Sequence, residues 1–198
     1  MNEFEQAYFS HGNYTYYTER RDRYAKTAQE LAAFFLRTGL VTPEQSVLDY
    51  GCALGFLVVG LRDAGFKCEG YDISDWAAAE AAKLDVNYVT KKATDFGMIV
   101  ALDVLEHMTD AQIEEALGLF RSPHLLVRIP VSTDGGKTFN LKISQNDPSH
   151  VNCKTKDGWY SLLRRTGFPF VSTIGLFTIY DTPGVLCALF SRQPLTLR

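Results

Sequence analysis

Residues 47–56 read Val-Leu-Asp-Tyr-Gly-Cys-Ala-Leu-Gly-Phe. An apolar run leads into a turn of small residues and then into a helix, whose first N–H groups have no partner within the helix. Asp72 follows at the end of the next expected strand, where an acidic group can bind both hydroxyls of a ribose. The stretch therefore predicts a turn that binds a nucleoside at the edge of a parallel sheet.

Strands and helices alternate around this turn. The apolar spacing predicts strands over 46–49, 67–73, 86–89, 98–102 and 125–130, and helices over 19–38, 56–64, 75–83, 111–120 and 157–166. Unbroken apolar strands between helices indicate a parallel sheet covered on both faces. Two final runs, 170–180 and 185–191, flank a good turn sequence at 181–184 and predict an antiparallel hairpin at the edge of the sheet.

Composition excludes several classes of protein. The 198 residues carry 20 basic and 23 acidic side chains, a net charge of −3, which argues against a nucleic-acid-binding surface. Apolar runs fall far short of the roughly 20 residues that a membrane-spanning helix needs. The polar, acidic start of the chain is unlike a signal peptide, and the four dispersed cysteines form no Cys-x-x-Cys pair. We therefore expect a cytoplasmic protein with reduced thiols.

Several motifs resemble those of the class I S-adenosylmethionine-dependent methyltransferases, in their small-molecule branch. Residues 47–55 resemble motif I, 70–74 (Gly-Tyr-Asp-Ile-Ser) the acidic second-strand motif, and 102–108 (Leu-Asp-Val-Leu-Glu-His-Met) the fourth-strand signature. The resemblance continues in 147–151 and in the late helix, 159–168. It implies an α/β fold with a Rossmann-like, doubly wound, seven-stranded sheet. That sheet would be mostly parallel with an antiparallel last strand and helices on both faces.

The same resemblance implies S-adenosylmethionine as cofactor and S-adenosylhomocysteine as product. The cofactor-binding residues that it implies are Tyr14, Asp49, Gly51, Cys52, Ala53, Gly55, Asp72, Ile73, Asp103 and Val104. By position, Asp49 would orient the ammonium group, Asp72 would bind the ribose and Ile73 would pack on the adenine. Asp103 would contribute its backbone carbonyl near the ammonium group.

Two features depart from the family pattern. Ala53 stands where a glycine is common, which leads us to expect a negative φ at this residue. The segment 90–96 is short, so the adenine contacts of the usual loop are open, with Thr90 or Lys91 as candidates.

His107 and His150 are the candidate catalytic residues. Both would lie at the carboxyl edge of the sheet, and histidine titrates near neutral pH, so either could act as a base or contact the substrate. The alternative for His107 is structural, with Glu106 and His107 anchoring the loop by hydrogen bonds. No matching cysteine, histidine or carboxylate spacing accompanies the two histidines, and we expect no metal site.

The chain shows no repeat or linker and is interpreted as a single methyltransferase domain, 1–198. Residues 1–44 would form an aromatic N-terminal lid and a helix, 45–131 the cofactor-binding half, and 132–198 the substrate-side loop and closing hairpin. The expected partner is a small-molecule methyl acceptor whose acceptor atom is open, with no nucleic acid and no membrane. The expected assembly is a monomer or a homodimer.

Two other functions compete with methyl transfer. An NAD(P)-dependent oxidoreductase needs Gly-x-Gly-x-x-Gly, but Ala53 and Phe56 occupy the second and third glycine positions. A cofactor-binding module without catalytic activity is the other alternative. Residues 134–138 (Asp-Gly-Gly-Lys-Thr) resemble the end of a phosphate loop, but Val131 stands at its first glycine, which argues against nucleotide-phosphate binding.

Overall fold

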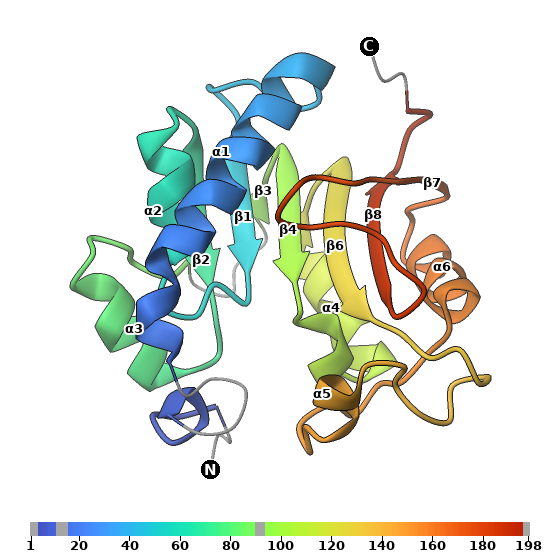
Figure 1. Ribbon diagram of the computed structural model, residues 1–198. Helices are drawn as coiled ribbons and strands as arrows, with labels where there is room; N and C mark the ends of the chain where they lie inside the picture. Colours follow the sequence, from blue (N-terminus) through green and yellow to red (C-terminus); the bar gives the residue numbers. More distant parts are fainter. Residues whose placement is uncertain (1–3, 11–15, 90–93, 196–198) are drawn as a thin grey trace. The chain divides into compact units, whose positions relative to one another are not determined.

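The computed structural model describes residues 4–10, 16–89 and 94–195. These residues form two compact units, one up to residue 91 and one from residue 92 onward. Figure 1 shows the helices and strands of each unit, coloured along the sequence. Each unit is described by itself below.

The first unit joins two parallel strands through a helix. Its elements are η1 (Tyr8–Ser10), η3 (Tyr17–Arg20), α1 (Arg21–Thr38), β1 (Ser46–Tyr50), α2 (Phe56–Asp63), β2 (Lys67–Tyr71) and α3 (Asp75–Ala82). β1 and β2 pair in parallel, with Asp49 opposite Gly70. α1 packs against α2, and α2 packs against β2. This βαβ unit places the turn after β1 at the carboxyl ends of both strands.

The long helix α1 follows from its apolar spacing. Ala28, Leu31 and Phe35 are buried at intervals of three and four residues, which puts them on one face of the helix. Gly39 ends the helix in the left-handed region, at a φ of 65°, and its N–H donates to the Phe35 carbonyl at 2.9 Å. The helix therefore ends at the glycine that the sequence predicted.

The second unit holds a mixed four-stranded arrangement. Its elements are β3 (Thr94–Asp95), β4 (Met98–Leu102), η4 (Leu105–His107), α4 (Asp110–Leu119), β5 (Phe120–Arg121), β6 (His124–Pro130), α5 (Lys142–Gln145), α6 (Lys156–Arg165), β7 (Phe170–Thr173) and β8 (Val185–Ser191). β4 pairs in parallel with β6, and β8 lies antiparallel between β6 and β7. β8 is buried along its whole length, so it belongs to the core of this unit. The short strands β3 and β5 form a separate parallel pair.

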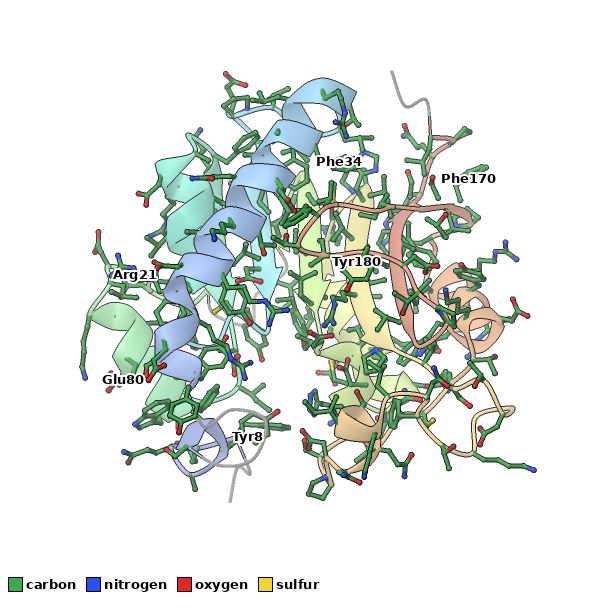
Figure 2. The ribbon with its side chains drawn as sticks, viewed as in Figure 1. Tyr8, Arg21, Phe34, Glu80, Phe170 and Tyr180 are labelled. Carbon is green, nitrogen blue, oxygen red and sulfur yellow. The ribbon has the colours of Figure 1, made fainter. Side chains whose placement is uncertain are left out.

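Side-chain caps fix the starts of two helices in this unit. Thr109 begins α4 with a capping box, in which Thr109 and Gln112 each accept a hydrogen bond from the other's backbone N–H. Thr155 caps α6 by accepting from the Gly158 N–H at 3.1 Å. Beyond that cap, α6 buries Trp159 completely. Figure 2 shows the side chains of both units, with Phe170 and Tyr180 among the exposed aromatic residues of the second.

The predicted fold class is confirmed, but the strand count is wrong. Apart from the short pair β3 and β5, the described residues hold two sheet strands in the first unit and four in the second, not the seven expected. The expected strand over 86–89 is reduced to an isolated parallel bridge between Tyr88 and Gly70. Val86 packs on Gly55, and the Tyr88 hydroxyl donates a hydrogen bond to the Ala53 carbonyl. These tertiary contacts, and not a ladder of strand hydrogen bonds, determine the course of the segment.

The remaining expectations differ in detail. The closing hairpin is present, but its first strand covers only Phe170–Thr173, and β3, β5 and α5 were not predicted. All four cysteines are free in the structure. In the described part of the chain, no helix is long and apolar enough to cross a membrane. The interpretation of residues 1–198 as one domain stays a prediction.

Candidate functional site

The turn after β1 alternates between ordinary and left-handed backbone. Gly51 and Gly55 have φ values of 80° and 77°, which glycine adopts at little cost. The N–H groups of Gly51 and Cys52 both donate to the Tyr71 carbonyl at the end of β2, at 2.7 and 3.0 Å. The Gly55 N–H donates to the Cys52 carbonyl at 2.8 Å and closes the turn just before α2. The turn is thus fastened to the end of the neighbouring strand.

Ala53 contradicts the expected negative φ, because its φ is 46°. A non-glycine residue in this region costs about 1 kcal/mol or more. Two hydrogen bonds offset that cost: the Ala53 N–H donates to Asp72 Oδ2 at 2.8 Å, and the Ala53 carbonyl accepts from the Tyr88 hydroxyl. The neighbouring residues therefore impose the left-handed conformation that a glycine would adopt unaided.

Gly70 is required by close packing between β2 and the turn. A Cβ atom at Gly70 would lie 2.6 Å from the Cys52 sulfur, and Cys52 is buried. Gly55 is similarly crowded, with Val86 side-chain atoms 3.0 Å from the position of a Cβ. The shape of the turn depends on these two glycines.

We expect Gly70→Ala to lower the free energy of unfolding by about 1–3 kcal/mol, because the added methyl group overpacks Cys52. Urea unfolding followed by circular dichroism measures the change. Gly118→Ala is the matched control, since nothing lies within 4 Å of a Cβ at Gly118 in α4. This control should be neutral or stabilising by up to ~1 kcal/mol. Equal stability of the two variants would mean that β2 moves away from Cys52 at little cost.

Asp49 and Asp72 place two carboxyl groups at the ends of β1 and β2. Asp49 is 5% exposed, and burial together with the charge of Asp72 raises its pKa from 3.8 to about 8. Burial also raises the pKa of Asp72, although N–H groups, including those of Ser74 and Ala53, partly offset the effect. Asp72 Oδ1 accepts from Ser74 at 3.0 Å. The Asp49 carboxyl group therefore keeps its proton near neutral pH, and a bound cation would favour its ionised form.

The other predicted cofactor residues of the first unit differ in exposure. Ile73 is 48% exposed directly after Asp72, an unusual position for a large apolar side chain. Cys52 is buried, and burial raises the pKa of its thiol, which keeps it protonated. Tyr14, Thr90 and Lys91 lie outside the described residues.

The aromatic N-terminal segment packs within the first unit. Phe9 stacks on Trp76 of α3 with ring centroids 5.2 Å apart, and Tyr17 stacks on Phe56 at 6.0 Å. Phe9 and Tyr17 share a buried cluster with Ala53 and its neighbours in the turn. The segment is therefore attached to the elements that carry the turn.

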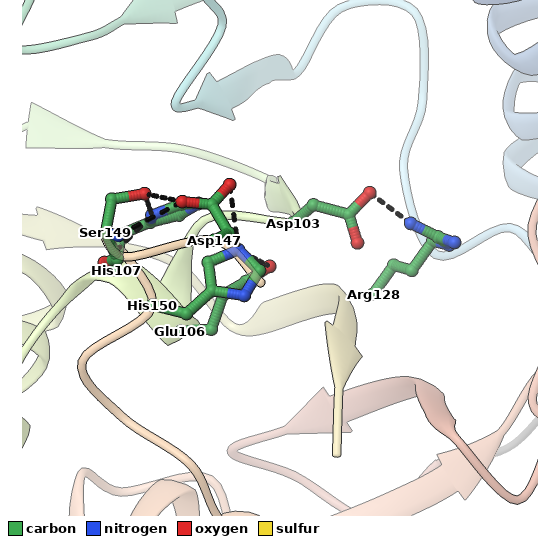
Figure 3. Close-up of polar contacts among 7 residues, drawn as sticks. All are labelled: Asp103, Glu106, His107, Arg128, Asp147, Ser149 and His150. Atoms are coloured by element: carbon green, nitrogen blue, oxygen red, sulfur yellow. Dashed lines mark hydrogen bonds and ion pairs between the residues drawn. The ribbon is translucent and has the colours of Figure 1, made fainter. Parts of the chain in front are cut away.

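In the second unit, Asp103 and Val104 follow β4. Asp103 has a φ of 57°, and its N–H donates to the Arg128 carbonyl of β6 at 2.7 Å. Its carboxylate also forms an ion pair with the Arg128 guanidinium group (Figure 3). This pairing holds an aspartate in a backbone conformation that it rarely adopts.

His107 and His150 lie against each other in the second unit, with ring centroids 4.5 Å apart. Glu106 completes a group in which one ligand-type atom of each side chain lies within 4.8 Å of the others. Figure 3 shows His150 between the carboxylates of Glu106 and Asp147, with its Nε2 atom 3.9 and 3.8 Å from their oxygens. The fold thus gathers two histidines and two carboxyl groups from the segments after β4 and β6.

Hydrogen bonds join these two segments. The Glu106 carbonyl accepts from the N–H groups of Val151 and Asn152, each at 3.0 Å. His107 Nδ1 lies 3.2 Å from the Ser149 carbonyl and 3.0 Å from its hydroxyl. The anchoring alternative described for Glu106 and His107 is therefore present in the structure, with Glu106 acting through its backbone.

Burial sets the protonation of this group. It lowers the pKa of His107 to about 4, with a further contribution from His150, and it also lowers the pKa of His150. Burial raises the pKa of Glu106, and the charge of Asp103 raises it further. Without a bound ion, the group is therefore neutral at both imidazoles.

Sequence reasoning missed Tyr88, Arg128 and Ser149. Tyr88 and Arg128 belong to no motif, and only their contacts with Ala53 and Asp103 reveal them. Ser149 lies within the matched segment 147–151, which was a signal for the loop but not for its contact with His107. The phosphate-loop alternative stays unsupported, because Asp134 Oδ1 accepts from the N–H groups of Lys137 and Thr138, each at 3.0 Å.

A methyltransferase domain profile matches residues 16–173, most of the 198-residue chain. The chain belongs to the methyltransferase domain family. The predicted membership of the S-adenosylmethionine-dependent class I methyltransferases is confirmed. A search of curated proteins found no match in sequence.

Solved structures share the fold of this methyltransferase domain at low sequence identity. Magnesium protoporphyrin IX methyltransferase from Synechocystis PCC 6803, with bound S-adenosylhomocysteine, is 20% identical with a TM-score of 0.60, covering 95% of this chain and 92% of that one. An S-adenosylmethionine-dependent methyltransferase from Archaeoglobus fulgidus is 15% identical with a TM-score of 0.59, covering 89% and 99%. The cyclase SpnF is 21% identical with a TM-score of 0.55, covering 75% and 60%. The fold is therefore shared by proteins described as catalysing different reactions.

Proposed function

We propose that this methyltransferase transfers the methyl group of S-adenosylmethionine to a small-molecule acceptor through an oxygen, nitrogen or carbon atom. The observation that carries the proposal is the turn of residues 51–55, which the Asp72 carboxylate holds in a left-handed conformation at Ala53. When bound, the cofactor supplies a methyl group that its positive sulfur already activates. The protein then has to bind the cofactor and the acceptor, orient them for transfer and exclude water from the site. Such positioning can lower the activation barrier by several kcal/mol.

The buried carboxyl group of Asp49 in the first unit fits the amino-acid end of this cofactor, which carries a positive ammonium group. Asp49 is a buried carboxyl group whose ionisation is opposed by desolvation and by Asp72. An ammonium group beside Asp49 would stabilise the carboxylate through charge–charge attraction. We therefore assign the ammonium group to Asp49 and the rest of the methionine portion to Gly51, Cys52, Ala53 and Gly55.

The nucleoside end fits the residues that follow β2. A carboxylate has about four lone-pair positions, and the N–H groups of Ala53 and Ser74 use two of those on Asp72. The remaining positions can accept from the two ribose hydroxyls. The exposed Ile73 side chain is suited to pack on an adenine ring. Tyr14, Asp103 and Val104 stay predicted cofactor contacts.

His107 and His150 stay candidates for a catalytic role. The predicted methyl acceptor is a small molecule. We also keep the N-terminal segment as a proposed lid, with ordinary packing of its aromatic rings as the alternative; Phe9 and Tyr17 lie in the buried cluster that holds Ala53. The proposal includes a cytoplasmic location, a monomer or homodimer, and no nucleic-acid or membrane partner.

Calorimetry tests the cofactor directly. We expect saturable binding of one S-adenosylhomocysteine per chain and no measurable binding of NAD at the same concentrations, because the turn lacks two of the three dinucleotide-motif glycines. Tighter binding of NAD than of S-adenosylhomocysteine would reverse the assignment in favour of an oxidoreductase.

Transfer is tested with S-adenosylmethionine labelled on its methyl group and a panel of candidate metabolites. Label that appears in an acceptor, together with S-adenosylhomocysteine in equal amount, is the expected result. Binding of the cofactor with no transfer to any metabolite class would favour the module without catalytic activity.

A further inference from the structure

The side chain of Glu106 has an unusual environment. It is fully buried, and neither carboxyl oxygen has a hydrogen-bond partner among the described residues. Burying a carboxyl group without partners is costly, and such groups in proteins are normally paired or coordinate a metal. Its neighbour His150 approaches one of these oxygens at 3.9 Å, which is too long for a hydrogen bond. Polar groups of Glu106 and His150 therefore face each other, but no hydrogen bond joins them.

The carboxyl groups beside His150 lack a cationic partner. Among the described residues, no lysine or arginine lies within ion-pair distance of Glu106 or Asp147, and the Arg128 guanidinium group pairs with Asp103. A divalent cation in contact with the Glu106 carboxyl group would displace its proton and balance the charge of the carboxylate that forms.

We propose that Glu106, His107 and His150 bind a divalent transition-metal ion. Bonds from zinc to imidazole nitrogen or carboxylate oxygen are about 2.0–2.2 Å, so two ligand atoms of a tetrahedral site lie roughly 3.4 Å apart. The three ligand atoms lie within 4.8 Å of one another. Side-chain rotations that shorten the longest of these separations by up to roughly 1.4 Å would close the group around an ion.

The surrounding hydrogen bonds orient the ligands as in metal sites of other proteins. A proton on His107 Nδ1, donated to the Ser149 carbonyl, leaves the basic lone pair of the ring on Nε2. Ser149 is held in turn by Asp147 Oδ1, which accepts from its N–H at 3.0 Å and from its hydroxyl. Metal-binding histidines commonly bond through their second nitrogen to a carbonyl or carboxylate, which fixes the ring and its tautomer.

The donor set selects the class of ion. Two imidazoles and one carboxylate suit zinc, iron, cobalt or manganese, whereas magnesium prefers oxygen ligands. Three protein ligands leave positions for water or for an oxygen of the acceptor, as in catalytic metal sites. In this assignment both histidines act as ligands, which is an alternative to their predicted role as a base. This proposal departs from the sequence-based expectation of no metal site, which rested on the spacing of the two histidines; the loop after β6 brings His150 to Glu106 and His107 across that distance.

Metal binding is tested on the full chain after treatment with a chelator, by calorimetric titration with zinc chloride and without any cofactor. We expect one zinc ion per chain and a loss of affinity of at least ~100-fold in Glu106→Gln and in His150→Ala, each of which removes one ligand. His124→Ala is the matched control, since His124 is another partly buried histidine of the second unit and lies outside the group. This control should bind zinc like the wild type. Magnesium should bind at least ~100-fold more weakly than zinc.

Cobalt substitution gives an independent readout on the wild-type chain if a variant fails to fold. Visible cobalt bands without a thiolate charge-transfer band are expected, since the ligands are nitrogen and oxygen. Absence of saturable zinc binding, zinc binding that Glu106→Gln and His150→Ala leave unchanged, or a thiolate band would each overturn the metal site. Titration with S-adenosylhomocysteine is a separate measurement, so failure of the metal site and failure of the proposed cofactor are distinguishable.

Discussion

Replacing Asp72 with alanine should weaken the binding of S-adenosylhomocysteine by roughly 10- to 100-fold. Hydrogen bonds from the ribose hydroxyls to a carboxylate are worth roughly 1.5–3 kcal/mol, which corresponds to this loss. The structure adds a second cause, because Asp72 also accepts from the Ala53 and Ser74 N–H groups. Without the carboxylate, the left-handed turn at Ala53 loses one of its two supports. We therefore expect a loss at the upper end of the range.

Calorimetry at constant pH measures this change, with Asp75→Ala as the control. Asp75 is an exposed carboxylate three residues away, at the start of α3, and should leave the affinity within about threefold of the wild type. Tyr88→Phe separates the two causes, since it removes the other support of Ala53 and leaves the carboxylate in place. An unchanged dissociation constant in Asp72→Ala would contradict the assignment of the ribose to this residue.

The sequence predicts the fold well wherever one local pattern decides an element. The strand over 98–102 agrees with β4 at both ends. Gly39 ends α1 as predicted, in the left-handed conformation that glycine adopts at little cost. Prediction fails at 86–89, whose apolar residues read as a strand. Val86 instead packs on Gly55, and the segment makes a single bridge to β2. Such tertiary contacts have no signature in the local sequence.

In the candidate site, too, the sequence predicts the residues of a local motif but not the contacts between distant segments. Asp49, Asp72 and the small residues of the turn are visible as a motif because the backbone geometry requires them at fixed spacing. Ala53 shows where this logic stops: one of the two hydrogen bonds that support its left-handed φ comes from Tyr88, a residue that lies 35 positions further along the chain. The contact of His107 with His150 also depends on a long loop whose course no periodic pattern predicts.

Replacing Asp49 with asparagine should remove much of the pH dependence of stability between about pH 4 and 8. The native carboxyl group has its pKa raised from 3.8 to about 8, because burial and the charge of Asp72 oppose ionisation. Between these values the native protein keeps a proton that the unfolded chain has released. The stability from this group is therefore complete below about pH 4 and is lost as the pH rises through 8. The expected slope is about −1.4 kcal/mol per pH unit.

Urea unfolding of wild type and Asp49→Asn at pH 6, 7 and 8 measures this difference, and the variant should gain about 1 kcal/mol per pH unit relative to the wild type. The same variant should bind S-adenosylhomocysteine more weakly, because an amide cannot neutralise an ammonium group. Cofactor binding to the wild type should release a proton near pH 7, since the bound ammonium lowers the pKa of Asp49. Calorimetry in buffers of different ionisation enthalpy detects that proton, which should be absent in the variant. Parallel unfolding curves for the two proteins at all three pH values would show that Asp49 is already ionised in the native state, and the proton release would then be absent as well.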